Sequence, residues 1–294
     1  MIPGRTTKSI GAFMVIPVFL IATLLFVPRA LAQADAQLDT PRPMNSIVVS
    51  SMAFAIVFGA AMAGRVLRRA LPEDHLGTDA KDVIKLTTGL VGTLAALVLG
   101  MLVSSAKTSY DARKNEVALM SSQIVAIDRL LANYGPETKE LREGLRAQVE
   151  AGIDRIWPSQ ASRQAQLRPT ENPQSYFNGL RLLAPKNDVQ AATKAEVISM
   201  SDNLRQTRWL LFIESEQSSV PRPLLVILIA WLAVIFISFG LFAPPNPTVA
   251  VTLFIGALAV SAAIFIILEM YTPFSGVLRI SSAALREALS QIGH

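Results

Sequence analysis

The stretch Leu86–Val117, LTTGLVGTLAALVLGMLVSSAKTSYDARKNEV, passes from apolar to charged residues without a helix-breaking residue at the change. Its first part, Leu86–Val103, approaches the roughly 20 residues that a helix needs to cross the hydrocarbon core of a membrane. No Gly or Pro lies between Gly100 and Tyr134. We therefore expect one helix to continue from the membrane into a polar region. The stretch predicts an all-α membrane protein with a helical extramembrane part.

Four other apolar runs accompany this one, and the composition agrees with a membrane location. The 294 residues are 51% hydrophobic and 17% charged, whereas a soluble domain carries about 25% charged residues. The other runs are Ile10–Val27, Ile47–Val66, Leu224–Ala243 and Thr248–Leu268. The pattern predicts two transmembrane hairpins (45–106 and 221–270), an extramembrane insert (107–220) and a C-terminal turn with an amphipathic helix (271–294).

The first run has the features of a secretory signal peptide. Arg5 and Lys8 precede it, and Ala30-Leu31-Ala32 supplies the small residues of a cleavage site. The run is also long enough to span a membrane. Residues 1–32 are therefore either a signal peptide cleaved after Ala32 or an N-terminal anchor helix.

Lys and Arg beside the runs predict the orientation, because such residues are retained on the cytoplasmic side of a membrane. The second run, Ile47–Val66, ends in Arg65, Arg68 and Arg69. If they lie inside, the insert and the C-terminal segment lie outside. Three basic residues at the start of the insert favour the opposite orientation. On this balance we expect a multi-pass protein of the bacterial inner membrane with a periplasmic insert.

Small residues recur every four positions along the run Leu86–Val103 and just beyond it. They are Thr88, Gly92, Ala96, Gly100 and Ser104. Stripes of this kind let helix backbones approach closely, so one interpretation is tight packing against a neighbouring helix. The other interpretation is a narrow wall that faces the central axis of a pore. The sequence leaves both open.

The insert has nearly balanced charge, with 15 Lys/Arg and 14 Asp/Glu. Its first helix carries apolar residues at heptad spacing, which is typical of a coiled coil or of a helix that packs inside a bundle. We favour packing within one subunit, because further helices follow. The heptad residues are Val117, Met120, Ile124, Ile127, Leu131 and Tyr134.

Three more helices are expected in the insert. One begins at Pro136 and ends at Trp157, and a polar loop follows it at Ser159–Pro173. A short helix covers about Gln174–Leu183. Asn187 or Asp188 can cap the last long helix. The insert thus reads as a helical bundle.

The residues offer little chemistry for catalysis. There is no Cys, and the two His, His75 and His294, lie far apart in sequence. Glu73-Asp74-His75 reads as a solvated loop, and Asp128-Arg129 as part of an ion pair. We expect no enzymatic activity, no metal and no cofactor. The net charge of +5 comes with basic residues that flank the apolar runs, so we expect no nucleic acid either.

The middle of every run is free of ionisable residues. Such residues at membrane depth mark proton relays and coupling sites, so their absence argues against a pump or a proton-coupled transporter. A passive channel does not need them, because backbone dipoles and apolar constrictions can select and gate.

The C-terminal segment begins with a turn motif made of Glu269, Pro273, Phe274 and Gly276. We expect Glu269 to be hydrated where the last run leaves the hydrocarbon. Pro273 ends the helix and Gly276 permits a reversal. A final helix, capped by Ser281 or Ser282, then either folds back onto the bundle or the membrane surface, or forms a gate at a pore mouth.

Three segments together resemble the bestrophin-like membrane family of bacteria. They are Leu86–Val117 above, LRRALPEDHLGTDAKDVIKL at Leu67–Leu86, and ILEMYTPFSGVLRISSAALREAL at Ile267–Leu289. The resemblance covers about residues 45–291. It implies a distant relation to bestrophins, which are pentameric anion channels with four spans per subunit. It also favours a cytoplasmic insert, whereas the charges favour a periplasmic one.

Two functions follow as hypotheses. The first is an oligomeric channel for small, anionic solutes, with the lipid bilayer, inorganic ions and further copies of the chain as partners. The second is a non-conducting scaffold or sensor that binds a partner through the heptad face of the insert.

Overall fold

The computed structural model describes residues 45–70, 78–158, 174–217, 221–244 and 246–293. Every regular element in these ranges is a helix. The run Ile10–Val27, the segment Glu73–His75, the loop Ser159–Pro173 and His294 lie outside the described residues. The chain divides into two compact units, which we call the membrane unit (1–106 and 220–268) and the bundle unit (107–219 and 269–294).

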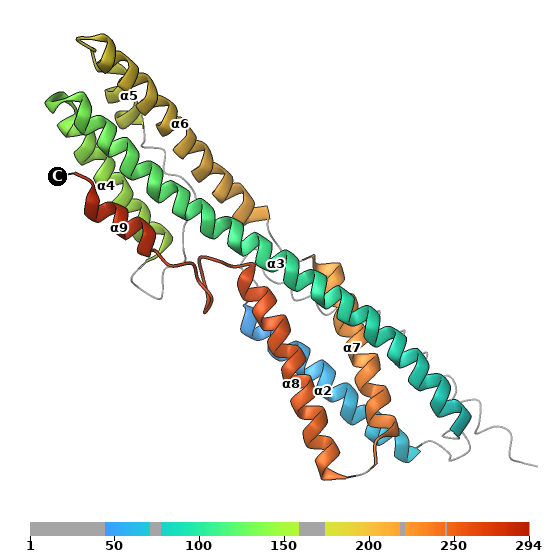
Figure 1. The fold of residues 1–294 in the computed structure, drawn as a ribbon. Helices are drawn as coiled ribbons and strands as arrows, with labels where there is room; N and C mark the ends of the chain where they lie inside the picture. Colours follow the sequence, from blue (N-terminus) through green and yellow to red (C-terminus); the bar gives the residue numbers. More distant parts are fainter. Residues whose placement is uncertain (1–44, 71–77, 159–173, 218–220, 245, 294) are drawn as a thin grey trace, which may run out of the picture. The chain divides into compact units, whose positions relative to one another are not determined.

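Four helices in the described ranges are long and apolar enough to cross a membrane. They are α2 (Ser46–Ala70), α3 (Thr78–Tyr134), α7 (Arg222–Phe242) and α8 (Pro247–Met270), shown in Figure 1. Each coincides with one of the predicted runs to within a few residues, so the all-α membrane fold is confirmed and the chain is a multi-pass membrane protein. As predicted, α3 continues without a break from its apolar run into the charged region.

Two glycines allow α2 and α7 to pack with their backbones in contact. A Cβ added to Gly64 would collide with the carbonyl oxygen of Ile237, and one added to Gly240 would collide with the carbonyl oxygen of Ala61. Each helix therefore supplies a glycine where the other helix approaches it. Such small residues are the usual means of helix association in a membrane, where lipid removes the hydrophobic drive between helices.

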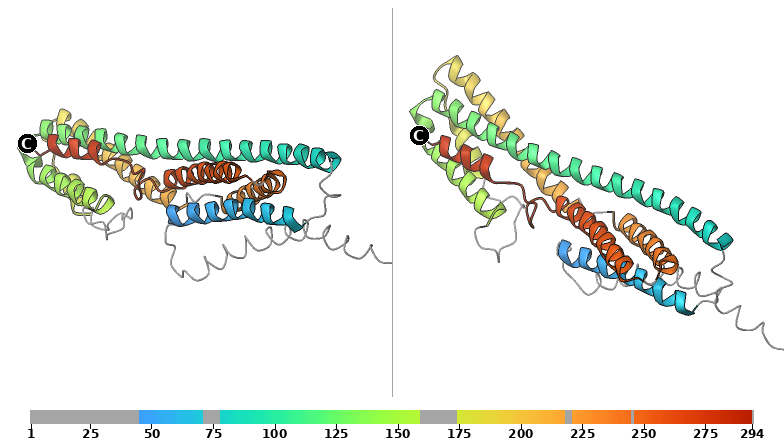
Figure 2. Two further views of the ribbon diagram at one scale, coloured as in Figure 1. Left: turned by 90° about the horizontal axis from the view of Figure 1, so that it is seen from below. Right: turned by 60° about the horizontal axis from the view of Figure 1, so that its bottom comes forward.

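Aromatic rings join α8 to α2 within the membrane unit. The ring of Phe254 meets those of Phe54 and Phe58 edge to face, with centroids 5.3 and 5.5 Å apart. This geometry places the positive edge of one ring against the negative face of another. It fixes α8 beside α2, as the views in Figures 1 and 2 also show.

The bundle unit is a set of packed helices around the second part of α3. Its other elements are the 3-10 helix η2 (Pro136–Thr138), α4 (Lys139–Ile156), α5 (Gln174–Leu182), α6 (Asp188–Gln217) and α9 (Ala283–Gln291). The predicted second helix is thus preceded by a 3-10 turn at Pro136. Gly135, at φ +136°, reverses the chain before it, a conformation that favours glycine.

The heptad residues of α3 all lie inside this bundle. Each of the six is at most 7% exposed, and all but Tyr134 belong to two apolar clusters that also contain residues of α4, α5, α6 and α9. The heptad face is therefore covered by helices of the same chain. At the start of α6, the side chain of Asn187 accepts the N–H of Gln190 at 2.8 Å and acts as the cap.

Candidate functional site

The small-residue stripe of α3 is largely uncovered by the other helices of the membrane unit. Thr88 and Gly92 are half-buried, whereas Ala96, Gly100 and Ser104 are exposed. A Cβ added to Gly92 would touch only Ile235, at 4.0 Å, and one added to Gly100 would meet nothing within 4 Å. The stripe is therefore not used for packing on α2, α7 or α8 along most of its length. Its use against another copy or along a pore stays a prediction.

Two arginines at the end of α2 bind the end of α7 and the turn after it. The guanidinium of Arg68 donates to the carbonyl of Ala243, and that of Arg65 donates to the carbonyl of Asn246 at 3.5 Å. Carbonyls at a helix C-terminus have no partner within the helix and carry partial negative charge, which cations offset. These arginines and the α7–α8 turn thus lie at the same end of the membrane unit.

The C-terminal turn is organised around a buried carboxylate. Glu269, in the last turn of α8, is 3% exposed, and its Oε2 accepts the backbone N–H groups of Val277 at 2.5 Å and Leu278 at 3.1 Å. Gly276 has a φ of +86° and lies so close to this carboxylate that a Cβ there would collide with it. The expectation that Glu269 is hydrated is therefore wrong. Backbone amides take the place of water around its charge.

The segment after Pro273 is held against α4 by aromatic residues. The ring of Phe274 meets the indole of Trp157 edge to face, with centroids 5.8 Å apart. The indole Nε1 of Trp157 donates to the carbonyl of Ile280 at 2.8 Å. The N–H of Ile280 in turn donates to the carbonyl of Pro273 at 2.7 Å, which closes the turn. Trp157, which marked only a helix end in the sequence, thus anchors the C-terminal segment.

Helix α9 lies on the bundle, between α3 and α4 (Figure 2). Arg146 of α4 donates to the carbonyls of Leu289 at 3.1 Å and Ile292 at 2.6 Å, and so caps the C-terminus of α9. Ser121 of α3 donates to the carbonyl of Ala284 at 2.6 Å. At the start of α9, the hydroxyl of Ser281 accepts the N–H of Ala283 at 3.1 Å. Of the predicted alternatives, folding back onto the bundle is the arrangement observed.

Asp128 forms an ion pair across two helices of the bundle. Both of its oxygens accept from Arg142 of α4, at 2.8 and 2.9 Å, and it also accepts the N–H of Gly293 at 3.3 Å. The hydrogen bonds from Arg142 to Asp128 raise the pKa of the guanidinium, and burial opposes part of the rise. The adjacent Arg129 is exposed. Asp128 therefore ties α3, α4 and the chain end together, a structural use of charge.

The described residues contain no group of three or more His, Asp or Glu that could hold a metal ion. The groups described above bind backbone amides, carbonyls and each other, so they serve to position helices. Several of their partners lie far away in sequence, as with Arg68 and Ala243, which are 175 residues apart. Local patterns therefore carry no signal for these pairs. A basic residue near a helix end is the only hint.

Comparison with known protein families finds one family that covers these features. The model of the Bestrophin-like domain matches residues 54–285, which is most of the chain. The match includes the stripe on α3, the bundle unit up to Leu285 and the turn around Glu269. No curated protein and no solved structure matches the chain.

Proposed function

Because the chain belongs to the Bestrophin-like domain family, as its three quoted segments predicted, we propose that it forms an oligomeric channel for small ions, and for anions in particular. The family match is the observation that carries the proposal. Bestrophins, to which the family is distantly related, are pentameric anion channels. A single chain with four spans would supply one subunit.

Two features of the membrane unit support a pore built from several copies. The stripe on α3 presents small side chains on a face that the chain's own helices leave uncovered around Ala96 and Gly100. Neighbouring copies can approach closely along such a face. The four spans also keep ionisable side chains away from their middles. An ion path through them would rely on backbone and hydroxyl dipoles.

We propose that the channel lies in the bacterial inner membrane with the bundle unit in the periplasm, and that it catalyses no reaction. The orientation rests on Arg65, Arg68 and Arg69, since all three lie at the C-terminal end of α2, and basic residues favour the cytoplasmic side.

The surface that the scaffold hypothesis proposed for partner binding is buried within the chain. The hypothesis required the heptad face of α3 to be available to a partner protein. That face is buried by α4, α5, α6 and α9 of the same chain. A scaffold would therefore have to use another surface, and no specific observation favours one.

Electrical recording of the full-length protein tests the proposal. Purified protein in planar bilayers should give discrete currents, and the reversal potential should shift when a chloride gradient is imposed. The variant Gly100→Leu adds bulk to the stripe and should alter the conductance or the assembly. Gly59→Leu is the matched control, because an added Cβ at either glycine meets nothing within 4 Å in one chain. Silent bilayers with a verified oligomer would contradict the proposal.

A further inference from the structure

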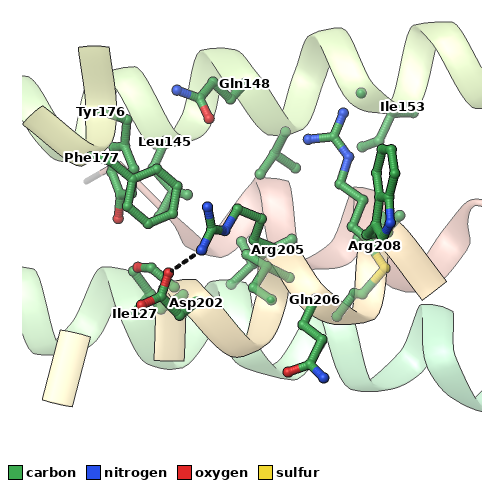
Figure 3. Close-up of a pocket in the computed structure, with 18 of the residues that line it drawn as sticks. Ile127, Leu145, Gln148, Ile153, Tyr176, Phe177, Asp202, Arg205, Gln206 and Arg208 are labelled. Atoms are coloured by element: carbon green, nitrogen blue, oxygen red, sulfur yellow. Dashed lines mark hydrogen bonds and ion pairs between the residues drawn. The ribbon is translucent and has the colours of Figure 1, made fainter. Parts of the chain in front are cut away.

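A cavity of about 710 Å³ lies within the bundle unit, between α3, α4, α5 and α6 (Figure 3). Binding sites for small molecules have volumes of about 300–1,000 Å³. Apolar side chains form most of the wall, among them Ile127 of α3 and Val149, Ile153 and Ile156 of α4. Leu285 brings α9 into the same wall. The cavity is therefore large enough for a small molecule with an apolar body.

The charged groups on the wall are not balanced. Arg205 of α6 donates to Asp202 at 2.9 Å, and its guanidinium lies 5.3 Å from the centre of the Phe177 ring. Arg208, one turn further along α6, is half-buried and has no ion pair or hydrogen bond among the described residues. Figure 3 shows its side chain rising from α6 towards Ile153 of α4. Among the described residues that line the cavity, Arg208 is thus a cation without a counter-charge.

The surroundings of Arg208 disfavour its charge. Burial lowers the pKa of its guanidinium, and the like charge of Arg155 lowers it further. A partly buried cation without a partner is a cost to the fold, and an anion placed against it would offset that cost. Because a guanidinium presents two parallel N–H donors, a carboxylate can bind it through a bidentate pair of hydrogen bonds.

We propose that this cavity binds a small monocarboxylate with an apolar body, with the carboxylate on Arg208 and the hydrocarbon part against the α4 wall. One unmatched cation selects a single negative charge. The apolar wall favours a ligand with hydrocarbon over a hydrated inorganic anion, because it offers few groups to replace water. The site lies wholly in the bundle unit, so the proposal does not depend on ion conduction.

Photolabelling of the full-length protein in lipid nanodiscs tests the site directly. The probe is octanoic acid with a diazirine on its chain, and the labelled peptides are identified by mass spectrometry. Labels should fall on α4 and α6, and octanoate should compete for them. The neutral octanamide should compete about tenfold less well, since it loses a charge-assisted hydrogen bond. Labels confined to the four spans would mean partition into the bilayer only, and would overturn the proposal.

Two glycines of α4 provide matched variants. An added Cβ meets nothing within 4 Å at Gly152, which lines the cavity, or at Gly144, which does not. Gly152→Leu should therefore fill the cavity and abolish labelling of α4 and α6, while Gly144→Leu should leave it unchanged. Equal labelling of the two variants would overturn the proposal.

Charge is tested by a second pair of variants. Arg208→Gln removes the unmatched cation and should weaken competition by octanoate about tenfold. Arg129→Gln removes an exposed arginine of the same bundle and should not change it. If octanoate competes for labelling of Arg208→Gln as well as it does for labelling of the unmodified protein, the carboxylate assignment is wrong. Equal competition by octanoate and octanamide would contradict it in the same way.

Discussion

At the scale of single residues, Glu269 shows how a charge at a membrane exit becomes structural. Its carboxylate is surrounded by the N–H groups of Val277 and Leu278 and by the backbone of Gly276. Hydrogen bonds to an ionised acceptor are about twice as strong as those between neutral groups. Glu269 therefore holds the reversal that returns the chain to the bundle.

Replacement of Glu269 by Gln tests this assignment. Glu269→Gln keeps the shape but places a neutral amide against two N–H donors, so we expect a loss of about 1.5–3 kcal/mol in the free energy of unfolding. The measurement is thermal unfolding in nanodiscs, combined with proteolysis of the C-terminal segment. Glu287→Gln, at an exposed site on α9, is the control and should change little. Equal stability of both variants would contradict a structural use of Glu269.

Tyr176 is a second buried polar residue, and it predicts a pH dependence. Burial raises the pKa of its phenol from 10.0 to about 12, with a smaller opposing effect from the hydroxyl of Ser201. Among the residues that the structure describes, neither hydroxyl has a hydrogen-bond partner of ordinary geometry. Between these pH values the folded chain keeps the phenol proton and the unfolded chain releases it. Stability that is present below pH 10 is therefore lost as the pH rises towards 12.

The variant Tyr176→Phe isolates this effect. It should change the free energy of unfolding by less than about 1 kcal/mol at pH 7, because it removes an unsatisfied hydroxyl. Between pH 10 and 12, the unmodified protein should lose about 2–3 kcal/mol more than the variant. Chemical unfolding at a series of pH values measures the difference. If the free energy of unfolding depends on pH in the same way for both proteins, the pKa of the Tyr176 phenol is not raised in the folded state.

At the scale of elements, the contact between α2 and α7 depends on glycine at Gly64 and Gly240. Each lies against a backbone carbonyl of the other helix, where no flexible side chain can move away. A side chain at either position must push the helices apart. The spacing of these two spans is therefore set by backbone contact.

A leucine scan of two α2 glycines tests this contact. Gly64→Leu should lower the free energy of unfolding by about 1–3 kcal/mol or more, as overpacking does elsewhere. Gly59→Leu lies on the same helix with open space around it, and its better helix propensity should make it neutral or slightly stabilising. Thermal unfolding in nanodiscs compares them. If Gly64→Leu is as stable as Gly59→Leu, the close approach is not required.

At the scale of the whole molecule, the chain has two units whose residues are not consecutive. The C-terminal segment joins the insert in the bundle unit, although α7 and α8 lie between them in sequence. Whatever side of the membrane holds the insert must therefore also hold α9. The two spans α7 and α8 lie between the insert and α9 in sequence, and an even number of spans returns the chain to the same side.

Thiol labelling tests the proposed orientation, since the chain contains no cysteine. Glu150→Cys places one thiol on an exposed site of α4, and Asp82→Cys places one before the α3 apolar run. In intact cells of a bacterial host whose outer membrane admits the reagent, a maleimide that cannot cross the inner membrane should label only Glu150→Cys. Asp82→Cys should require permeabilised inner membranes. The reverse pattern would place the bundle in the cytoplasm.

The sequence by itself determined the spans, the unbroken course of α3 and the short helices of the insert. These features depend on local hydrophobicity, helix periodicity and the positions of Gly and Pro, all of which can be read within a few turns. The family resemblance could also be recognised from three segments, and the match over 54–285 confirmed it. The expected start of α4 differed only by the 3-10 turn at Pro136.

Only the tertiary structure decided which surfaces are covered and which charges are paired. Trp157 binds Ile280 across 123 residues of sequence, and Asp128 pairs with Arg142 of another helix. Glu269 is buried because the chain folds back over it, which its place at the end of an apolar run could not show. Arg208 faces a cavity that exists only when α3, α4, α5, α6 and α9 come together. Such relations arise only when separate helices and turns pack together, so a local sequence pattern does not reveal them.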